Sequence, residues 1–261
     1  MTRPHKDFSY DRRLVPRQIV RPLLRWRAHN LVCREQRILI GFTPKAGCSF
    51  ASKVFFHNAA QHNEDRYLEW PHTYRIEYQY QQPVRLADWF NRGITKIKFV
   101  RNPFARAVSG YFQAMRTRLN PAIASSVGQE RVNWCFEEYL DWLSQTHLDL
   151  TNPHFCPQKY WGEGRLFRYD LCIKIEEAID GLQLADERFL RMPCHLNHSK
   201  HHAQRKPRPG YAGATVYSAL KDHEHSFPDW ISFYNNDSVK RVVDFYRRDF
   251  AEYGYALDPS Y

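Results

Sequence analysis

The sequence lacks both the features of a disulfide-stapled chain and those of a membrane-anchored one. Its six cysteines are scattered and form no C-x-x-C pair; they stand at positions 33, 48, 135, 156, 172 and 194. This spacing excludes a small disulfide scaffold and favours reduced thiols in a cytosol. No apolar run is long enough to cross a bilayer, and the arginine-rich N-terminus has no apolar signal-peptide core. We therefore expect a cytoplasmic protein without a membrane segment.

Negative charge is also scarce. The chain has 28 acidic residues against 38 lysines and arginines, which gives a formal net charge of +10. This excess favours an anionic ligand, partner or surface, and by itself it does not choose among nucleotides, acidic glycans, nucleic acid and membranes. With 261 residues, 43% of them apolar and 15% aromatic, the chain can bury one substantial core and is not expected to be disordered.

The chain is organised around a strand, a tight loop and a helix at residues 37–52. Residues 37–40 are mostly aliphatic and predict a short buried strand, and the following T-P-K-A-G-C-S runs into a helical pattern. A loop at a helix N-terminus cradles an anion with its free backbone N–H groups. The candidate binding residues are Pro44, Lys45, Ala46, Gly47, Cys48 and Ser49. The loop is not a Walker A motif, because Lys45 precedes Gly47 instead of following it.

A second unit of the same kind covers residues 94–111. Residues 94–100 predict a strand from their β-branched content, Asn102 is a good helix N-cap, and Pro103 suits the first helical position. One apolar stripe on the helix would pack against the sheet, which leaves Arg101 and Ser109 available for binding. Because parallel strands end at the same sheet edge, Arg101 and the Lys45 loop can face one crevice.

The alternation of strands and helices predicts an α/β fold, with a P-loop-like, mainly parallel central sheet flanked by helices. We expect a basic N-terminal arm over residues 1–36, helical over 19–30, and a single domain over residues 37–261. The further expected elements are strands over 72–78 and 166–176, helices over 84–91, 134–143, 186–191 and 239–253, and loops over 120–130, 151–160 and 195–213.

The motifs together resemble a known family. T-P-K-A-G-C-S resembles the 5′-phosphosulfate loop, and V-R-N-P-F-A-R-A-V-S-G-Y-F the 3′-phosphate motif, of sulfotransferases that use 3′-phosphoadenosine 5′-phosphosulfate (PAPS). Further similar segments follow in the family's order: H-F-C-P-Q from 154, Y-D-L-C-I-K-I-E from 169, H-L-N-H-S from 195 and D-F-Y-R-R-D-F-A-E-Y-G-Y from 244. The group includes carbohydrate sulfotransferases for chondroitin, dermatan and the HNK-1 glycan, with bacterial relatives. Asn102 departs from the Asp or His common in the family.

The resemblance implies that an acceptor hydroxyl, which we expect to belong to a carbohydrate, attacks sulfur in line without a metal. Lys45 would neutralise the bridging oxygen and the 5′-phosphate, which the N–H groups of residues 47–49 would hold. Arg101 and Ser109 would bind the 3′-phosphate. Lys200 and Arg205, in the basic loop, would close over the 3′-phosphate or the adenine.

A base must also take the proton of the acceptor hydroxyl, and histidine suits this task near neutral pH. His72 is the first candidate, because related enzymes place a His or Glu on the strand before the 3′-phosphate motif. His154 is the second, from the H-F-C-P-Q segment, and Glu69 is a weaker alternative.

Three other interpretations stay open on the residues alone. Cys194 and the histidines at 195, 198, 201 and 202 suggest zinc, but their spacing fits no standard ligand set. The positive charge suggests nucleic-acid binding. No known nucleic-acid motif occurs in the sequence, so we do not expect nucleic acid as a partner. A P-loop-like kinase would need carboxylates for Mg²⁺, and neither loop supplies an obvious one.

Overall fold

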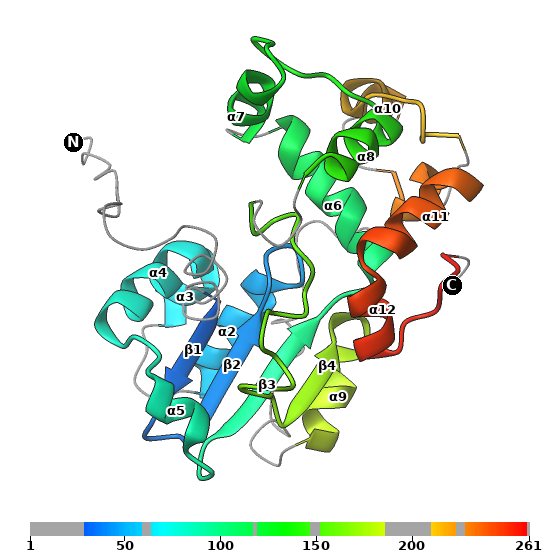
Figure 1. Ribbon diagram of the computed structural model, residues 1–261. Coiled ribbons are helices and arrows are strands. Elements are labelled where there is room, and N and C mark those ends of the chain that lie inside the picture. The colour runs from blue at the N-terminus through cyan, green and yellow to red at the C-terminus, as the bar shows by residue number, and fades with distance from the viewer. Residues whose placement is uncertain are drawn as a thin grey trace, which may run out of the picture.

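A four-stranded sheet forms the centre of the computed structural model, which describes residues 29–58, 64–116, 119–146, 152–185, 210–222 and 228–259. The strand order is β1 (Asn30–Cys33), β2 (Ile38–Phe42), β3 (Thr95–Val100), β4 (Leu171–Lys174). β2, β3 and β4 are parallel, and β1 is an antiparallel edge strand, as Figure 1 shows. The predicted α/β fold with a mainly parallel sheet is confirmed.

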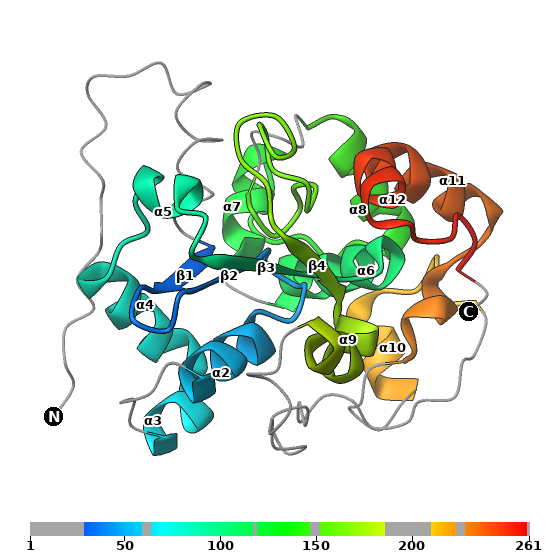
Figure 2. The same ribbon diagram turned by 90° about the horizontal axis from the view of Figure 1, so that it is seen from below.

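Both faces of the sheet are covered, which explains why its strands are almost continuously apolar. Ile38, Ile40 and Phe99 face α2 (Cys48–Asn58), α3 (Glu64–Glu69) and α9 (Ala178–Ala185). Leu39 on the opposite face packs with Trp89 of α5 (Leu86–Phe90) and with Tyr160 and Tyr169. Figure 2 shows these two layers below and above the sheet.

A second, larger apolar cluster lies beyond the C-terminal end of β3. It is built around α6 (Pro103–Arg116), whose Phe104 and Tyr111 are fully buried. The helices that contribute to it are α7 (Leu119–Ser126), α8 (Phe136–Ser144), α10 (Val216–Asp222), the short 3₁₀ helix η4 (Trp230–Phe233), α11 (Asn236–Phe245) and α12 (Arg247–Tyr253). Through this cluster the helices of the lobe at the top of Figure 1 pack against one another.

The N-terminal boundary predicted from the sequence is wrong in part. Residues 30–33, assigned to a basic arm and to the end of a helix, form β1 and pair with β2 from Asn30 opposite Gly41 to Cys33 opposite Ile38. The strand is fully buried because Leu31 and Val32 contribute to the two faces of the sheet. The sheet therefore begins before residue 37, and residues 1–28 of the predicted arm lie outside the described part of the chain.

The strand predicted over 72–78 is wrong as well. Those residues belong to a helix, α4 (Pro71–Gln81), with Pro71 at its start. Tyr74 and Tyr78, one helical turn apart, both pack edge-to-face on Phe56 of α2. The helical spacing of the tyrosines thus half-buries one stripe, while Ile76, which the alternating pattern would also bury, is 59% exposed.

Other elements differ in extent from the prediction. Helix α7 replaces much of the loop expected over 120–130, and the strand expected over 166–176 shortens to β4, followed by a 3₁₀ turn η1 (Ile175–Glu177). The helix expected over 239–253 breaks at Tyr246 into α11 and α12. Gly254 ends α12 with a left-handed backbone, as predicted. The helix expected over 186–191 and the basic loop up to residue 209 lie outside the described residues.

Candidate functional site

The loop between β2 and α2 turns tightly into the helix. Lys45 and Gly47 both have a left-handed backbone, with φ of 69° and 73°. The N–H of Ala46 donates to the carbonyl of Thr43 at 3.1 Å, which closes the turn. A Cβ on Gly47 would lie 2.6 Å from Cδ1 of Ile175, so only glycine fits there. The first N–H groups of α2 have no intrahelical acceptor and lie at the end of this turn, the arrangement that binds an anion.

Lys45 extends from this loop toward α6. Its Nζ donates to Oε1 of Gln113 at 3.3 Å. Burial lowers the pKa of the Lys45 ammonium, and the positive charges of Arg101 and Arg106 lower it further, against the opposing effect of Cys48. Three cations therefore gather around one loop.

Arg101 joins the two strand–loop–helix units. It follows β3 directly, and its NH1 donates to the carbonyl of Lys45 at 3.1 Å. The next residue, Asn102, caps α6 as predicted, because its Oδ1 accepts from the N–H of Phe104 at 2.9 Å. Burial is the main reason that the pKa of Arg101 is lowered, and Glu176 partly offsets it. The predicted meeting of Arg101 and the Lys45 loop is therefore present in the structure.

Ser109 lies on α6, in the second turn after the cap, and is half-buried. It makes no hydrogen bond to Arg101 or to the loop among the described residues. Lys200 and Arg205, the other two residues predicted to bind the donor, lie outside the described part of the chain, as does the cluster from Cys194 to His202.

His72 lies at the start of α4 and reaches the loop. Its Nε2 is 2.9 Å from Oγ of Ser49, in the first turn of α2. Neighbouring atoms displace part of the water around the exposed ring and lower its pKa, and the charges of Arg75 and Lys45 add to this. His72 is therefore a neutral imidazole near pH 7.

His154 approaches the same region from the segment before β4. Its Nδ1 lies 2.7 Å from Oδ1 of Asn152, which also accepts from the His154 N–H at 3.1 Å. An amide oxygen cannot donate, so Nδ1 carries the proton and Nε2 keeps its lone pair. Burial lowers the pKa of His154 to about 4, assisted by the charges of Lys45, Arg106 and His72. Glu69, at the end of α3, is exposed and shows no contact with the loop.

Arg106 is a site residue that the sequence reasoning missed. Its side chain is 1% exposed, its Nε donates to the carbonyl of Pro44 at 3.1 Å, and its NH2 to the carbonyl of Pro153 at 3.3 Å. It therefore ties the loop to the segment that carries His154. The sequence feature that could have identified Arg106 is its position in F-A-R-A-V, where an arginine interrupts an apolar stretch.

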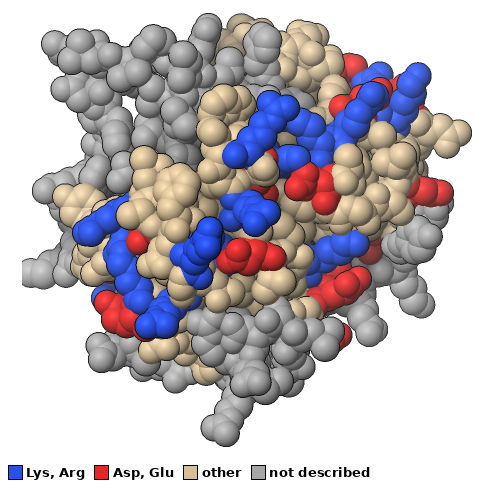
Figure 3. Space-filling view, turned by 60° about the horizontal axis from the view of Figure 1, so that its bottom comes forward, with Lys and Arg blue, Asp and Glu red and all other residues tan. Residues whose placement is uncertain are grey.

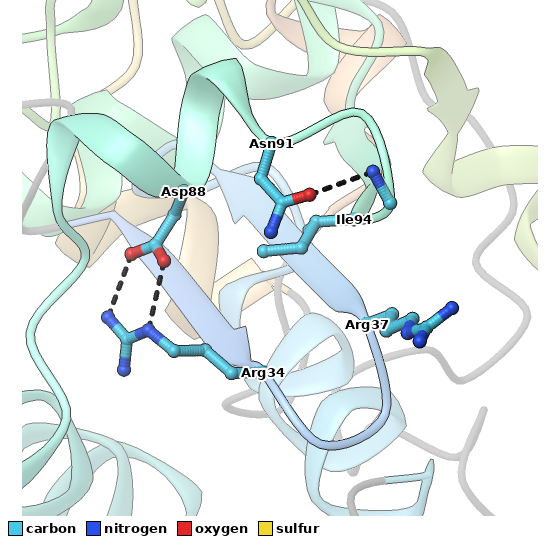
Figure 4. A pocket seen from close by; sticks show the side chains of 6 residues that line it. Arg34, Arg37, Asp88, Asn91 and Ile94 are labelled. Carbon is cyan, nitrogen blue, oxygen red and sulfur yellow. Dashed lines mark hydrogen bonds and ion pairs between the residues drawn. The ribbon is translucent and has the colours of Figure 1, made fainter.

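A hollow elsewhere on the sheet is not part of this site. It has a volume of about 330 Å³ and lies at the N-terminal ends of β2 and β3, opposite the two loops. Figure 4 shows Arg34 turned to Asp88, with which it pairs at 2.8 Å, and Arg37 pointing away from Asn91 and Ile94. The charge of Arg34 at this hollow is thus already neutralised by the carboxylate of Asp88.

The residues that the structure describes contain no group of three or more His, Cys, Asp or Glu side chains arranged to hold a metal ion. None of their helices has the length and apolar character that crossing a bilayer requires.

The structure is that of an α/β protein in which three cations gather around a tight loop between a strand and a helix. The family model described as "Sulfotransferase family" matches residues 28–256, which is most of the chain. The chain belongs to this sulfotransferase family and is accordingly a transferase. Comparisons with characterised proteins and with solved structures gave no match.

Proposed function

We propose that the protein transfers the sulfuryl group of PAPS to a hydroxyl of a carbohydrate acceptor. Membership of the sulfotransferase family supports sulfuryl transfer in general. The donor is inferred from the two loops, which offer separate anion sites at one sheet edge, as a nucleotide with phosphates at both the 3′ and 5′ positions requires.

The observation that carries the proposal is a cluster of cations without carboxylate partners. Arg101 contacts the carbonyl of Lys45 and Arg106 that of Pro44. In the part of the chain that the structure describes, none of these three cations forms an ion pair with Asp or Glu. Glu176 and Asp249 offset part of this positive charge without forming ion pairs with it. The repulsion that remains costs free energy, and an anionic ligand lowers that cost.

The residues of the site suit this donor. The N–H groups at the start of α2, in residues 47–49, would hold the 5′-phosphate, and Lys45 would neutralise the charge that develops on the leaving oxygen. Arg101 would bind the 3′-phosphate with Ser109, and Lys200 and Arg205 remain proposed to cover the nucleotide. Bound PAPS supplies the electrophilic sulfur; the acceptor oxygen forms the new S–O bond while the S–O bond to the 5′-phosphate breaks.

His72 is the proposed base, and His154 the second candidate. Each ring is neutral near pH 7 because its pKa is lowered, so each can accept the proton of the acceptor hydroxyl. His72 has the more accessible ring, and its hydrogen bond to Ser49 places it beside the loop. We propose the carbohydrate acceptor on the family resemblance of the motifs alone.

The test is a calorimetric titration with adenosine 3′,5′-bisphosphate (PAP), compared with AMP, in the absence of metal. We expect PAP to bind at least about tenfold more tightly, because a charge-assisted contact to a second phosphate contributes roughly 1.5–3 kcal/mol. Equal affinities would contradict the proposed donor.

Two other measurements address the alternatives. Affinity for DNA that falls steeply with salt, together with no PAP binding, would favour a nucleic-acid-binding protein. Turnover of ATP that depends on Mg²⁺ would favour a P-loop-like kinase.

A further inference from the structure

We propose that Gln158 is a positioning residue that fixes Arg101 and thereby sets the preference for a nucleotide with a 3′-phosphate. This role rests on the proposed function, because it assumes that Arg101 reads the 3′-phosphate.

The side-chain amide of Gln158 holds the main chain of Arg101 from both sides. Its Oε1 accepts from the Arg101 N–H at 2.8 Å, and its Nε2 donates to the Arg101 carbonyl at 2.7 Å. The ladder between β3 and β4 ends one residue earlier, at Val100 opposite Lys174. The amide therefore supplies the two hydrogen bonds that a further strand residue would make, and it extends the order of the sheet to Arg101.

Gln158 is itself held firmly. It is fully buried, its N–H donates to Oδ2 of Asp249, and its carbonyl accepts from Nζ of Lys98 at 2.7 Å. Lys98 also donates to Oε2 of Glu163 at 2.5 Å. Asp249 and Lys98 are both completely buried, so the main chain from which the Gln158 amide extends is fixed by groups that cannot relax into water.

Arg101 transmits this position to the donor site. With its main chain clamped by Gln158, its NH1 reaches the carbonyl of Lys45 at 3.1 Å. The clamp therefore sets the separation between the cation that would bind the 3′-phosphate and the loop that would bind the 5′-phosphate. If Arg101 is loosened, the loop keeps its hydrogen bond from Ala46 to Thr43 and the one from Arg106 to Pro44, so the main loss is the contact to the 3′-phosphate.

The experiment measures PAP and AMP affinity by calorimetry in the wild type and in Gln158→Met, which keeps the side-chain length and removes both hydrogen bonds. We expect PAP affinity to fall by about tenfold, because the buried main-chain groups of Arg101 lose their partners, and AMP affinity to stay unchanged. In the Arg101→Ala background, Gln158→Met should cause no further loss of PAP affinity. Unchanged PAP affinity, or equal losses for PAP and AMP, would overturn the proposal.

Tyr253→Phe is the matched control. The Tyr253 hydroxyl contacts Lys98 and Glu163 in the same buried network and makes no contact with Arg101. Loss of this hydroxyl should lower stability without changing the ratio of PAP to AMP affinity. A changed ratio would show that weakening the buried network anywhere alters the preference for PAP, and it would contradict a specific role of Gln158.

Two further outcomes are decisive. If Gln158→Met does not fold, Gln158→Glu replaces it, since it keeps the acceptor for the Arg101 N–H and loses the donor to the carbonyl; an unchanged ratio there would again overturn the role. A wild-type protein that binds PAP and AMP equally would overturn the proposed donor, and this role with it.

Discussion

At the scale of single residues, Lys45 and Arg101 have different proposed tasks although they lie side by side. Lys45 acts on charge that develops during transfer, whereas Arg101 binds a phosphate that does not change. We expect Lys45→Ala and Arg101→Ala each to abolish transfer, Arg101→Ala mainly through donor affinity. Activity at saturating PAPS and titration with PAP would separate the two. Full activity in either variant would refute its assigned role.

The two histidines can be distinguished by turnover. His72→Ala should lower kcat by about 10²–10⁴-fold, the usual contribution of general base catalysis, while PAP binding stays near that of the wild type. His154→Ala serves as the matched variant. Turnover unchanged in His72→Ala and reduced in His154→Ala would assign the base to His154 instead.

The buried position of His154 predicts a loss of stability in acid. Its pKa is lowered from 6.5 to about 4 by burial and by Lys45, Arg106 and His72. Between these pH values the unfolded chain binds a proton that the folded chain does not, so the free energy of unfolding decreases as the pH falls from 6.5 toward 4.

His154→Gln, which does not titrate, should therefore show a smaller decrease over that pH range. Urea unfolding at several pH values measures the decrease, with His57→Gln on the helix α2 as the control variant. Equal acid dependence in His154→Gln and the wild type would contradict the lowered pKa.

Site residues can be identified from the sequence when their role follows from a local motif. Lys45 and Gly47 belong to one short loop, and Arg101 follows a strand directly, so their spacing along the chain fixes where they lie. Arg106 and Gln158 could not be found in this way. Their importance depends on partners 62 and 57 residues away, Pro44 and Arg101, which only the packing of α6 and of the segment before β4 brings near.

At the scale of elements, α4 shows why an alternating pattern can mislead. His72, Tyr74, Ile76 and Tyr78 alternate as a strand would, but the rings of Tyr74 and Tyr78 pack on α2 while Ile76 is exposed. The segment is helical because its tyrosines pack on Phe55 and Phe56 of α2. This tertiary contact cannot be predicted from the local sequence pattern. By contrast, α6 could be predicted in detail, because Asn102 and Pro103 mark its start.

The helical state of α4 can be tested at its exposed face. Ile76→Pro should destabilise the protein by about 3 kcal/mol, because proline removes a hydrogen bond in the helix interior. Ile76→Ala should be close to neutral, since the side chain is 59% exposed and alanine favours helix. Urea unfolding measures both; equal stability of the two variants would contradict a helix at this position.

At the scale of the whole molecule, the sequence predicted the fold class and a mainly parallel sheet but not the antiparallel strand at its edge. β1 was missed because only four residues form it, and its burial depends on α4, whose Tyr78 hydroxyl donates to the carbonyl of Val32 at 2.8 Å. The net charge of +10 also says little about the surface. Figure 3 shows Lys and Arg interspersed with Asp and Glu over the face in view, with no uniformly positive surface there.

Lys98 links the sheet, the segment before β4 and the C-terminal helix. From β3, its Nζ donates to the carbonyl of Gln158, to Glu163 and to the hydroxyl of Tyr253 in α12. Burial lowers the pKa of Lys98, and Glu163 opposes that effect. A buried ion pair adds little net stability, but removing one partner strands the other charge in a medium that solvates it poorly.

Lys98→Met should therefore destabilise the protein by about 3–5 kcal/mol, measured by urea unfolding, because Glu163 is left buried and unpaired. Lys98→Met combined with Glu163→Gln should recover part of this loss, since no uncompensated charge remains. The surface pair of Arg66 and Glu77 on α3 and α4 is the control, and Arg66→Met should cost less than about 1 kcal/mol because both side chains are half exposed. A double variant less stable than Lys98→Met would show that the network stabilises the fold through Glu163 itself and not by neutralising Lys98.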